Sequence, residues 1–531
     1  MKTIYAHARE VLVWLGQEDN AVGKAFKYLR RFKPTFVGST NLLTLGFEQS
    51  YFSESDSDWQ AIGFNFAIPD GKGHLLTADL VSLMKLLERP WFRRLWVLQE
   101  VTHAKRVTLI SGRSTVDWKL LAWLIRDLYH SGLILDSFTQ KAQIGVLAVV
   151  EMENARQSTV SENQRSLLSV LLATHSGECS DIRDKIYAVL NLADDYDLEK
   201  DIDSFGPDYH LSPREAFTRF ARWSVARGNL DILSCTTRTE TRAIEGLEGL
   251  PSWVPDWTRI DNETPFIRYK DIVPFNASAS LRPLVSDSPR VTDDDKLILS
   301  GVAIDVVKGV GPLSSFKTSG IYQRQPADIV DVLAANKKWL YDCLDLGYFI
   351  HRDPFSNFSC RKSFWKTMTA GLTGEGYQAP PSYGLYFHKY LHLLKEMHQP
   401  ATSEVINDPN LENTPVLAVK NYDRQRREES AAIESAILMW ASKRQFAITK
   451  DRRMALVPNG TREGDIIVIA AGSRVPLVLR AMPTESSVYY ISLGEAFVDE
   501  LMDGRFLQSL FEKQTQYEKN AKELLQYFTI V

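Results

Sequence analysis

The sequence predicts an α/β unit at the N-terminal end, then a mostly helical region, then an α+β C-terminal region with a small antiparallel sheet. Three observations support this. The apolar runs VLVWLG (11–16) and RVTLISG (106–112) are typical of buried strands, and helical patterns precede and separate them. Residues 117–260 carry a succession of helical patterns. Between 444 and 500, short apolar runs alternate with Gly, Asn and Pro turns, which indicates a small antiparallel sheet or barrel.

The length of the chain indicates more than one domain, because 531 residues exceed an ordinary single domain and suggest about two to four. Composition and element pattern predict four consecutive parts. They are a partial α/β unit at 1–112, a helical region at 113–260 that completes it or packs on it, a polar linker or variable loop at 261–295, and an α+β region at 296–531.

The composition argues against several classes of protein. With 62 basic and 66 acidic residues the net charge is -4, so no basic field points to a nucleic-acid partner. The four cysteines are far apart without a CxxC pair, which disfavours a zinc ribbon and a disulfide framework. The longest apolar runs, such as 144–150, fall well short of a membrane span of about 20 residues. The N-terminal residues do not resemble a signal peptide. These features predict a cytoplasmic protein without a membrane segment.

The first ninety residues are expected to form helices around one strand. Residues 3–10 have helical character and run directly into the strand at 11–16. A helix follows over about 19–32, and residues 35–75, which are polar and Gly-rich, are expected to form a long irregular loop. A further helix is expected at 77–89.

Pro90 is expected to open a helix that runs to about His103, since the missing N–H of proline costs little in the first turn. Helical periodicity leaves two of its three faces apolar or aromatic, so this helix is expected to be largely buried. It also brings Trp96 and His103 within reach of Glu100, one turn before it and one turn after it.

The helical region is expected to contain helices at 117–130, 139–156, 163–174, 181–192 and 212–228. The last begins with Ser212 as the N-cap, Pro213 in the first turn and Glu215 at the capping-box position. LPSWVPDWT (250–258) contains too much proline for a regular helix and is expected to be a packed, extended closing segment.

The C-terminal region is expected to begin with a strand pair or one long strand at 296–307. Helices are expected at 325–345, 361–372 and 424–443, with a loop at 375–384. After the small sheet, an amphipathic helix is expected at about 505–528.

Several blocks together resemble the fungal heterokaryon incompatibility (HET) domain proteins. Four blocks lie in the first half of the chain and two in the C-terminal region: IYAHAREVLVWLG (4–16), RPWFRRLWVLQEVTHAKRVTLISG (89–112), DIRDKIYAVLNLADD (181–195), LPSWVPDWT (250–258), LVPNGTREGDIIVIAAGSRVPLVLR (456–480) and YISLGEAFVDELMDG (490–504). Their order is that of the family. The family's two opening blocks are not present, so the resemblance implies a chain without the first part of the HET domain, either as a truncated gene model or as a short form.

The resemblance implies a role in fungal self/non-self recognition with programmed cell death. It also implies a partial TIR-like, flavodoxin-like α/β fold, since HET domains are thought to be remotely similar to TIR domains, some of which cleave NAD. By that similarity Glu100 is the candidate catalytic carboxylate. Trp96, Arg93, Arg94 and His103 are candidate substrate contacts, NAD is the candidate substrate, and no bound cofactor or metal is expected. The expected partners are proteins, through self-association or an incompatibility partner.

Simpler interpretations of the same residues remain open. A buried glutamate needs a partner, so Glu100 could be a structural carboxylate paired with Arg93 or Arg94. Those arginines could equally pair with Glu88 or a helix end, while Trp96 and His103 could belong to the core. Arg183, in the DIRDK motif at 181–185, is expected to tie its helix to the α/β unit. The alternative function is a non-catalytic protein-interaction module.

Overall fold

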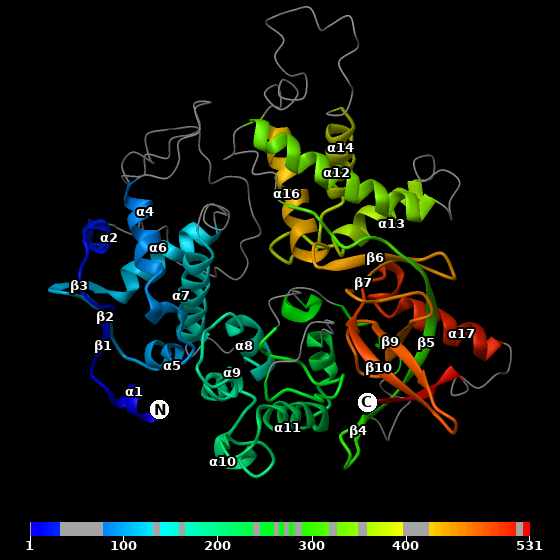
Figure 1. Ribbon diagram of the computed structural model, residues 1–531, viewed down its shortest axis with the longest axis horizontal. Helices are drawn as coiled ribbons and strands as arrows, with labels where there is room; N and C mark the ends of the chain where they lie inside the picture. Colours follow the sequence, from blue (N-terminus) through cyan, green and yellow to red (C-terminus); the bar gives the residue numbers. More distant parts are fainter. Residues whose placement is uncertain are drawn as a thin grey trace, which may run out of the picture. The chain divides into compact units, whose positions relative to one another are not determined.

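The computed structural model describes residues 2–31, 78–130, 139–158, 165–236, 245–259, 265–269, 275–279, 281, 289–317, 326–348, 358–396, 424–516 and 524–531. The loop expected at 35–75 lies outside these residues. The chain divides into two compact units, 1–198 and 199–531, which are described separately (Figure 1). The domain boundaries expected at residues 112, 260 and 295 stay predictions.

Unit 1 is a small sheet with helices and short 3-10 turns (η). Its elements are α1 (Lys2–His7), β1 (Val11–Trp14), α2 (Asn20–Arg31), α4 (Ala78–Leu87), η2 (Pro90–Arg93), α5 (Val97–Thr102), β2 (Val107–Ser111), β3 (Ser114–Asp117), α6 (Trp118–His130), α7 (Gln140–Ser158), α8 (Leu167–Thr174), α9 (Asp184–Tyr187) and η3 (Leu190–Leu192). The helix expected at 181–192 is therefore two short turns.

The sheet of unit 1 has the order β1-β2-β3. β1 and β2 pair in parallel from Val11 opposite Val107, whereas β3 returns antiparallel to β2 through a tight turn at Gly112, which has a φ of +54°. β1 is less buried than its apolar sequence predicts, because Leu12 and Trp14 on one face are 63% and 54% exposed. Strand β3 was not predicted. Mixed α/β structure is thus confirmed for this unit, while the TIR-like assignment stays a prediction.

The single helix expected from Pro90 to His103 is wrong. The backbone forms the 3-10 turn η2, becomes extended at Arg94 (ψ 130°), and only then enters the short helix α5. The break has a tertiary cause: the Glu178 N–H donates to the Arg93 carbonyl at 2.6 Å, and the Leu95 N–H donates to the Glu178 carbonyl at 2.9 Å. This bridge to a distant segment replaces the helical hydrogen bonds that the local sequence favours.

Unit 2 combines helices with a large sheet. Its helices and 3-10 turns are α11 (Pro213–Ala226), η4 (Leu230–Cys235), η6 (Phe266–Tyr269), α12 (Pro326–Tyr348), α13 (Phe358–Met368), α14 (Tyr383–Glu396), α16 (Arg424–Trp440), η8 (Asp499–Leu501) and α17 (Arg505–Gln516), while α10 (Leu198–Asp201) begins at the boundary between the units. The capping box predicted at Ser212 and Glu215 is confirmed. Helix α14 was not predicted.

The sheet of unit 2 closes on itself. Its strands are β4 (Arg290–Val291), β5 (Leu297–Val310), β6 (Arg444–Thr449), β7 (Met454–Pro458), β8 (Ile466–Ala470), β9 (Leu477–Pro483), β10 (Val488–Glu495) and β11 (Gln526–Ile530), in the order β11-β10-β9-β8-β5-β6-β7, with β4 beside β5. Because β11 also pairs with β5, the strands β5, β8, β9, β10 and β11 form a closed ring (Figure 1). This is larger than the small sheet predicted, and the helix predicted to reach 528 is wrong at its end, where β11 lies.

The core of unit 2 includes segments expected to be loops. Phe266, within the predicted linker, is fully buried and stacks on Trp440 with ring centroids 6.0 Å apart. In the predicted closing segment, Trp253 is fully buried and its Nε1 donates to the Asp295 carbonyl at 2.8 Å, so the packed interpretation is confirmed. The extended conformation is wrong, because the segment forms turns in which the Val254 N–H donates to the Pro251 carbonyl and the Arg259 N–H to the Asp256 carbonyl. In the part of the chain that the structure describes, no helix is both long and apolar enough to span a membrane.

Candidate functional site

The carboxylate of Glu100 lies on α5, half-buried beside an aromatic cluster. The Nε1 of Trp91 lies 3.4 Å from Glu100 Oε2 and donates to it. Trp91 is itself only 9% exposed, and it makes edge contacts with Phe92 and with Trp118, at centroid distances of 5.1 and 6.4 Å. The indole that serves Glu100 is therefore held by packing rather than free to turn.

Tyr5 of α1 is the second aromatic neighbour of Glu100. Burial and the negative charge of Glu100 raise the pKa of the Tyr5 phenol above its ordinary value of 10.0, so it is protonated at neutral pH. The charge of Glu100 thus acts on the Tyr5 phenol, and the helices that carry them, α1 and α5, are in contact. Neither Tyr5 nor Trp91 was singled out from the sequence as a partner of Glu100.

Trp96 does not pair with Glu100 as the uninterrupted helix would allow. Its Nε1 donates to Asp184 Oδ2 at 2.9 Å, in the DIRDK motif at the start of α9. Arg183 of the same motif forms a 2.6 Å ion pair with Asp181, and its expected tie to the α/β unit stays a prediction. Asp184, which is 8% exposed, thus connects this motif to the start of α5.

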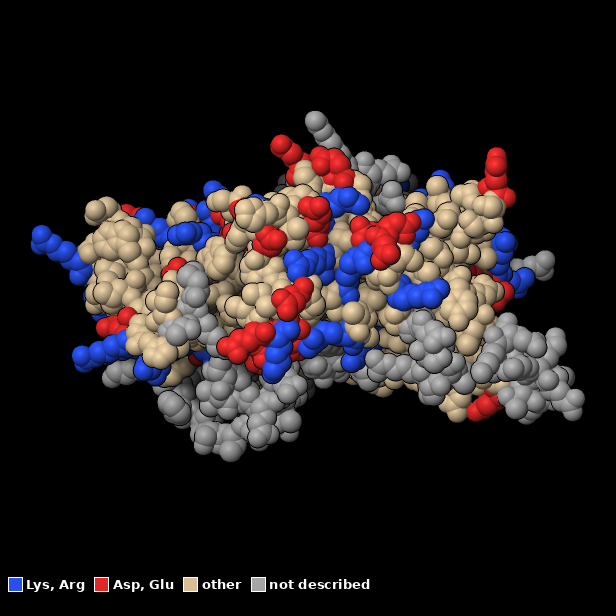
Figure 2. Space-filling view, turned by 90° about the horizontal axis from the view of Figure 1, so that it is seen from below, with Lys and Arg blue, Asp and Glu red and all other residues tan. Residues whose placement is uncertain are grey.

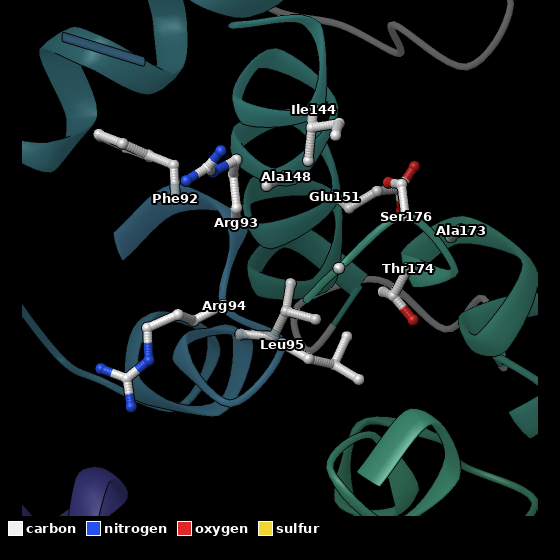
Figure 3. A pocket seen from close by; sticks show the side chains of 12 residues that line it. Phe92, Arg93, Arg94, Leu95, Ile144, Ala148, Glu151, Ala173, Thr174 and Ser176 are labelled. Atoms are coloured by element: carbon white, nitrogen blue, oxygen red, sulfur yellow. The ribbon is translucent and has the colours of Figure 1, made fainter. Parts of the chain in front are cut away.

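The two candidate arginines have different surroundings. Arg93 is 13% exposed in its side chain, and its Nε lies 3.5 Å from Glu178 Oε1. Pairing with Glu88 or Glu100 is therefore wrong for Arg93. Glu88 instead forms an ion pair with Lys85, with Nζ and Oε2 2.8 Å apart. Arg94 is exposed, and its side chain points away from that of Arg93 (Figure 3).

His103 is the C-cap residue of α5 and is half-buried. The carbonyls at this end of the helix are bound by Arg156 of α7, whose Nη1 donates to Val101 O and, at 2.9 Å, to Ala104 O. Burial lowers the pKa of the Arg156 guanidinium, and the nearby carboxylate of Glu153 opposes that shift. A cation at a helix C-terminus stabilises the last carbonyls, so α5 is fixed at this end by α7.

A shallow hollow lies between η2, the start of α5, α7 and the end of α8 (Figure 3). Its polar lining includes the side chains of Arg93, Glu151, Thr174 and Ser176. Its enclosed volume is about 20 Å³, room for about one water molecule and far below the roughly 300–1,000 Å³ typical of ligand pockets. Glu100 is not part of its lining, so the structure does not bring all the predicted site residues together in this hollow. No cluster of three or more metal-ligating side chains occurs among the described residues.

Sequence reasoning missed the contacts that Tyr5, Trp91, Asp184 and Arg156 make around α5. Asp184 and Trp91 lie within blocks that carry the family resemblance, but their contact partners could not be read from spacing. Trp96 and Asp184 are separated by 88 residues, and Arg156 lies 52 residues from Ala104. Contacts over such distances depend on how the helices pack.

Comparison with known proteins shows that the chain is similar to proteins of heterokaryon incompatibility. The family model described as heterokaryon incompatibility protein (HET) matches residues 1–100, and the Het-6 beta-barrel domain model matches residues 410–517. A relative named heterokaryon incompatibility protein 6, OR allele, from Neurospora crassa, is 23% identical over 95% of this chain and 78% of its own length. No solved structure shows a significant match. The predicted resemblance to heterokaryon incompatibility proteins is confirmed.

Proposed function

We propose that this chain acts in fungal heterokaryon incompatibility, where it triggers cell death on contact with a non-self partner. The observation that carries the proposal is the extended similarity to the Neurospora protein of that name, supported by the two family models at opposite ends of the chain. The protein acts in the cytoplasm, through protein partners or self-association.

The proposed chemistry is hydrolysis of NAD at the bond between nicotinamide and ribose. Water enters, nicotinamide leaves and ADP-ribose is released. Glu100 stabilises the oxocarbenium-like charge on the ribose as that bond breaks, which a single well-placed carboxylate can do. Support comes from its environment: the carboxylate is half-buried, Trp91 orients it, and Tyr5 lies beside it as a neutral phenol.

The candidate substrate contacts differ in whether their side chains already have partners in the protein. Arg94 is exposed and carries a guanidinium suited to bidentate contact with a phosphate. Trp96 and Arg93 already contact Asp184 and Glu178, so a role for them in NAD binding requires that these contacts are exchanged for contacts to substrate. His103 lies one turn beyond Glu100 at the end of the helix.

A non-catalytic interaction module is the second candidate function. It is favoured by the same two contacts, because they assign to Trp96 and Arg93 a structural role that needs no substrate. In that case α5 is a packing element, and Glu100 serves to satisfy the indole N–H of Trp91.

Induced expression in a filamentous fungus separates the two candidates. Wild type, Glu100→Gln and the control Glu485→Gln are compared, since Glu485 is an exposed carboxylate in the turn before β10. Loss of cellular NAD and of viability with wild type and control, but not with Glu100→Gln, supports catalysis. Cell death without loss of NAD in all three supports the interaction module, and unchanged growth in all three contradicts the incompatibility function of this chain.

A further inference from the structure

The helix that carries Glu100 is too short to hold its own position. α5 spans only six residues, Val97–Thr102. Isolated helices shorter than about 12 residues are not stable in water, because the first turn costs more conformational entropy than its hydrogen bonds return. The orientation of Glu100 therefore depends on the contacts that α5 makes with the rest of unit 1.

One distant segment, Glu178–Ala188, supplies the contacts at the start and the middle of α5. Its backbone at Glu178 pairs with the extended residues just before the helix. Asp184 accepts the indole N–H of Trp96, the N-cap residue of α5, at 2.9 Å. One turn later, the Nε2 of Gln99 donates to the Ala188 carbonyl at 2.6 Å. α5 is thereby attached along one side to a single segment.

Asp184 stands out among these contacts because it contributes a charge. Its carboxylate is 8% exposed, and a hydrogen bond to an ionised acceptor in a buried place is stronger than one between neutral groups. The indole of Trp96 is large and half-buried, so the direction in which it is held sets the start of the helix. Glu100 follows Trp96 by about one helical turn, and a rotation at Trp96 carries over to it.

We propose that Asp184 is the positioning residue of Glu100: through the indole of Trp96 it fixes the rotation of α5 and directs the Glu100 carboxylate toward Trp91. The expected effect of Asp184 on the rate rests on the proposed NAD hydrolysis, whereas its expected effect on the stability of α5 does not. A displacement of about 1 Å at a reacting group can lower a rate by about a hundredfold.

The test compares Asp184→Ala, Asp184→Asn and Asp181→Asn in the full-length chain. Asparagine keeps an acceptor oxygen for the Trp96 N–H, whereas alanine removes it. Asp181 lies in the same segment but pairs with Arg183, so its variant is the matched control. The measurements are kcat and KM for NAD, together with amide hydrogen exchange of residues 97–102.

The expected result for Asp184→Ala is a fall in kcat of at least tenfold with KM within about threefold, and at least tenfold faster exchange in α5. In Asp184→Asn, kcat and the exchange of α5 stay within about threefold of wild type, and Asp181→Asn leaves both at wild-type values. Unchanged exchange in α5 with Asp184→Ala overturns the proposal. So does equal slowing by alanine and asparagine, because asparagine keeps an acceptor oxygen for the Trp96 N–H and alanine does not.

The two proposals fail in distinguishable ways. If the wild-type chain does not consume NAD, the proposed chemistry is wrong, and the exchange of α5 alone decides whether Asp184 anchors the helix. If Asp184→Ala does not fold, Trp96→Phe removes the same hydrogen bond from the other side while it keeps an aromatic ring. Wild-type exchange of residues 97–102 in Trp96→Phe then counts against the proposal.

Discussion

Arg444 and Glu495 form an ion pair that is sealed from solvent in unit 2. Arg444 Nη2 lies 2.7 Å from Glu495 Oε1, and the two side chains are 1% and 2% exposed. The guanidinium also lies 4.0 Å above the ring of Phe266 and donates from Nη1 to the Trp440 carbonyl at 3.0 Å. The Phe266 N–H donates to the same Glu495 oxygen at 2.6 Å. One charge pair thus joins β6, β10, α16 and the segment at 266–269.

Removal of one member of this pair should strongly destabilise unit 2. Glu495→Ala leaves the buried guanidinium of Arg444 without its counter-charge, and such a loss costs about 3–5 kcal/mol. Urea unfolding followed by circular dichroism measures the change. As a control, Arg505→Ala breaks an ion pair with Asp503 in which the Arg505 side chain is 85% exposed, so the midpoint should hardly move. A loss below about 1 kcal/mol for Glu495→Ala would contradict this expectation.

The bond between Trp91 and Glu100 should appear as a coupling energy. In a double-mutant cycle of Trp91→Phe and Glu100→Ala, the double mutant should lose about 1 kcal/mol less stability than the sum of the two single losses. The reason is that either change alone already breaks the 3.4 Å contact. Chemical denaturation of the four proteins measures it. Full additivity would show that Glu100 gains nothing from the indole, and its orientation would then need another cause.

The capping box of α11 makes stability depend on pH. Hydrogen bonds from the backbone and the side chain of Ser212 lower the pKa of Glu215 below its ordinary value of 4.5. A carboxylate with a lowered folded pKa stabilises the fold above the unfolded pKa, and this contribution is lost as the pH falls through the folded pKa. The stability difference between wild type and Glu215→Ala should therefore be constant from pH 7 to about 5 and shrink below pH 4.5. Thermal unfolding of both proteins at stepwise lower pH measures this difference. A difference that grows below pH 4.5 would contradict the prediction.

Strand β11 should be needed to keep the barrel closed. Phe528 is 1% exposed and packs edge-on against Tyr490 with ring centroids 5.2 Å apart, so Phe528→Ala should cost about 3–5 kcal/mol. Its neighbour Tyr527 is 65% exposed on the other face of the strand, and Tyr527→Ala should change stability by at most about 0.5 kcal/mol. Calorimetry of both variants provides the comparison. Equal losses of stability would mean that Phe528 and Tyr527 do not lie on a buried and an exposed face of β11 in solution.

Elements with strong local signals were predicted well. Helix α11 has a proline in its first turn and a complete capping box, and it begins at the expected residue. β2 and the strands between 444 and 495 are apolar runs bounded by turn residues, and they form where they were expected. In each case the signal lies within a few residues of the element it specifies.

Elements that depend on a distant partner were predicted poorly. The helix expected from Pro90 is interrupted because Arg94 pairs with Glu178, and no local pattern shows this. β11 follows α17 in a stretch that reads as amphipathic helix, yet residues 526–530 pair with β5 more than 200 positions earlier in the chain.

The candidate site divides in the same way. By itself the sequence determined the family resemblance, the chemical type of the residues at 89–112, and Glu100 as the carboxylate to test. Only the tertiary structure decided that Trp91 contacts Glu100, that Trp96 is bound by Asp184, and that Arg93 lies against Glu178. The physical reason is that a side chain's type is local, whereas its partner is set by packing between segments that are up to 88 residues apart.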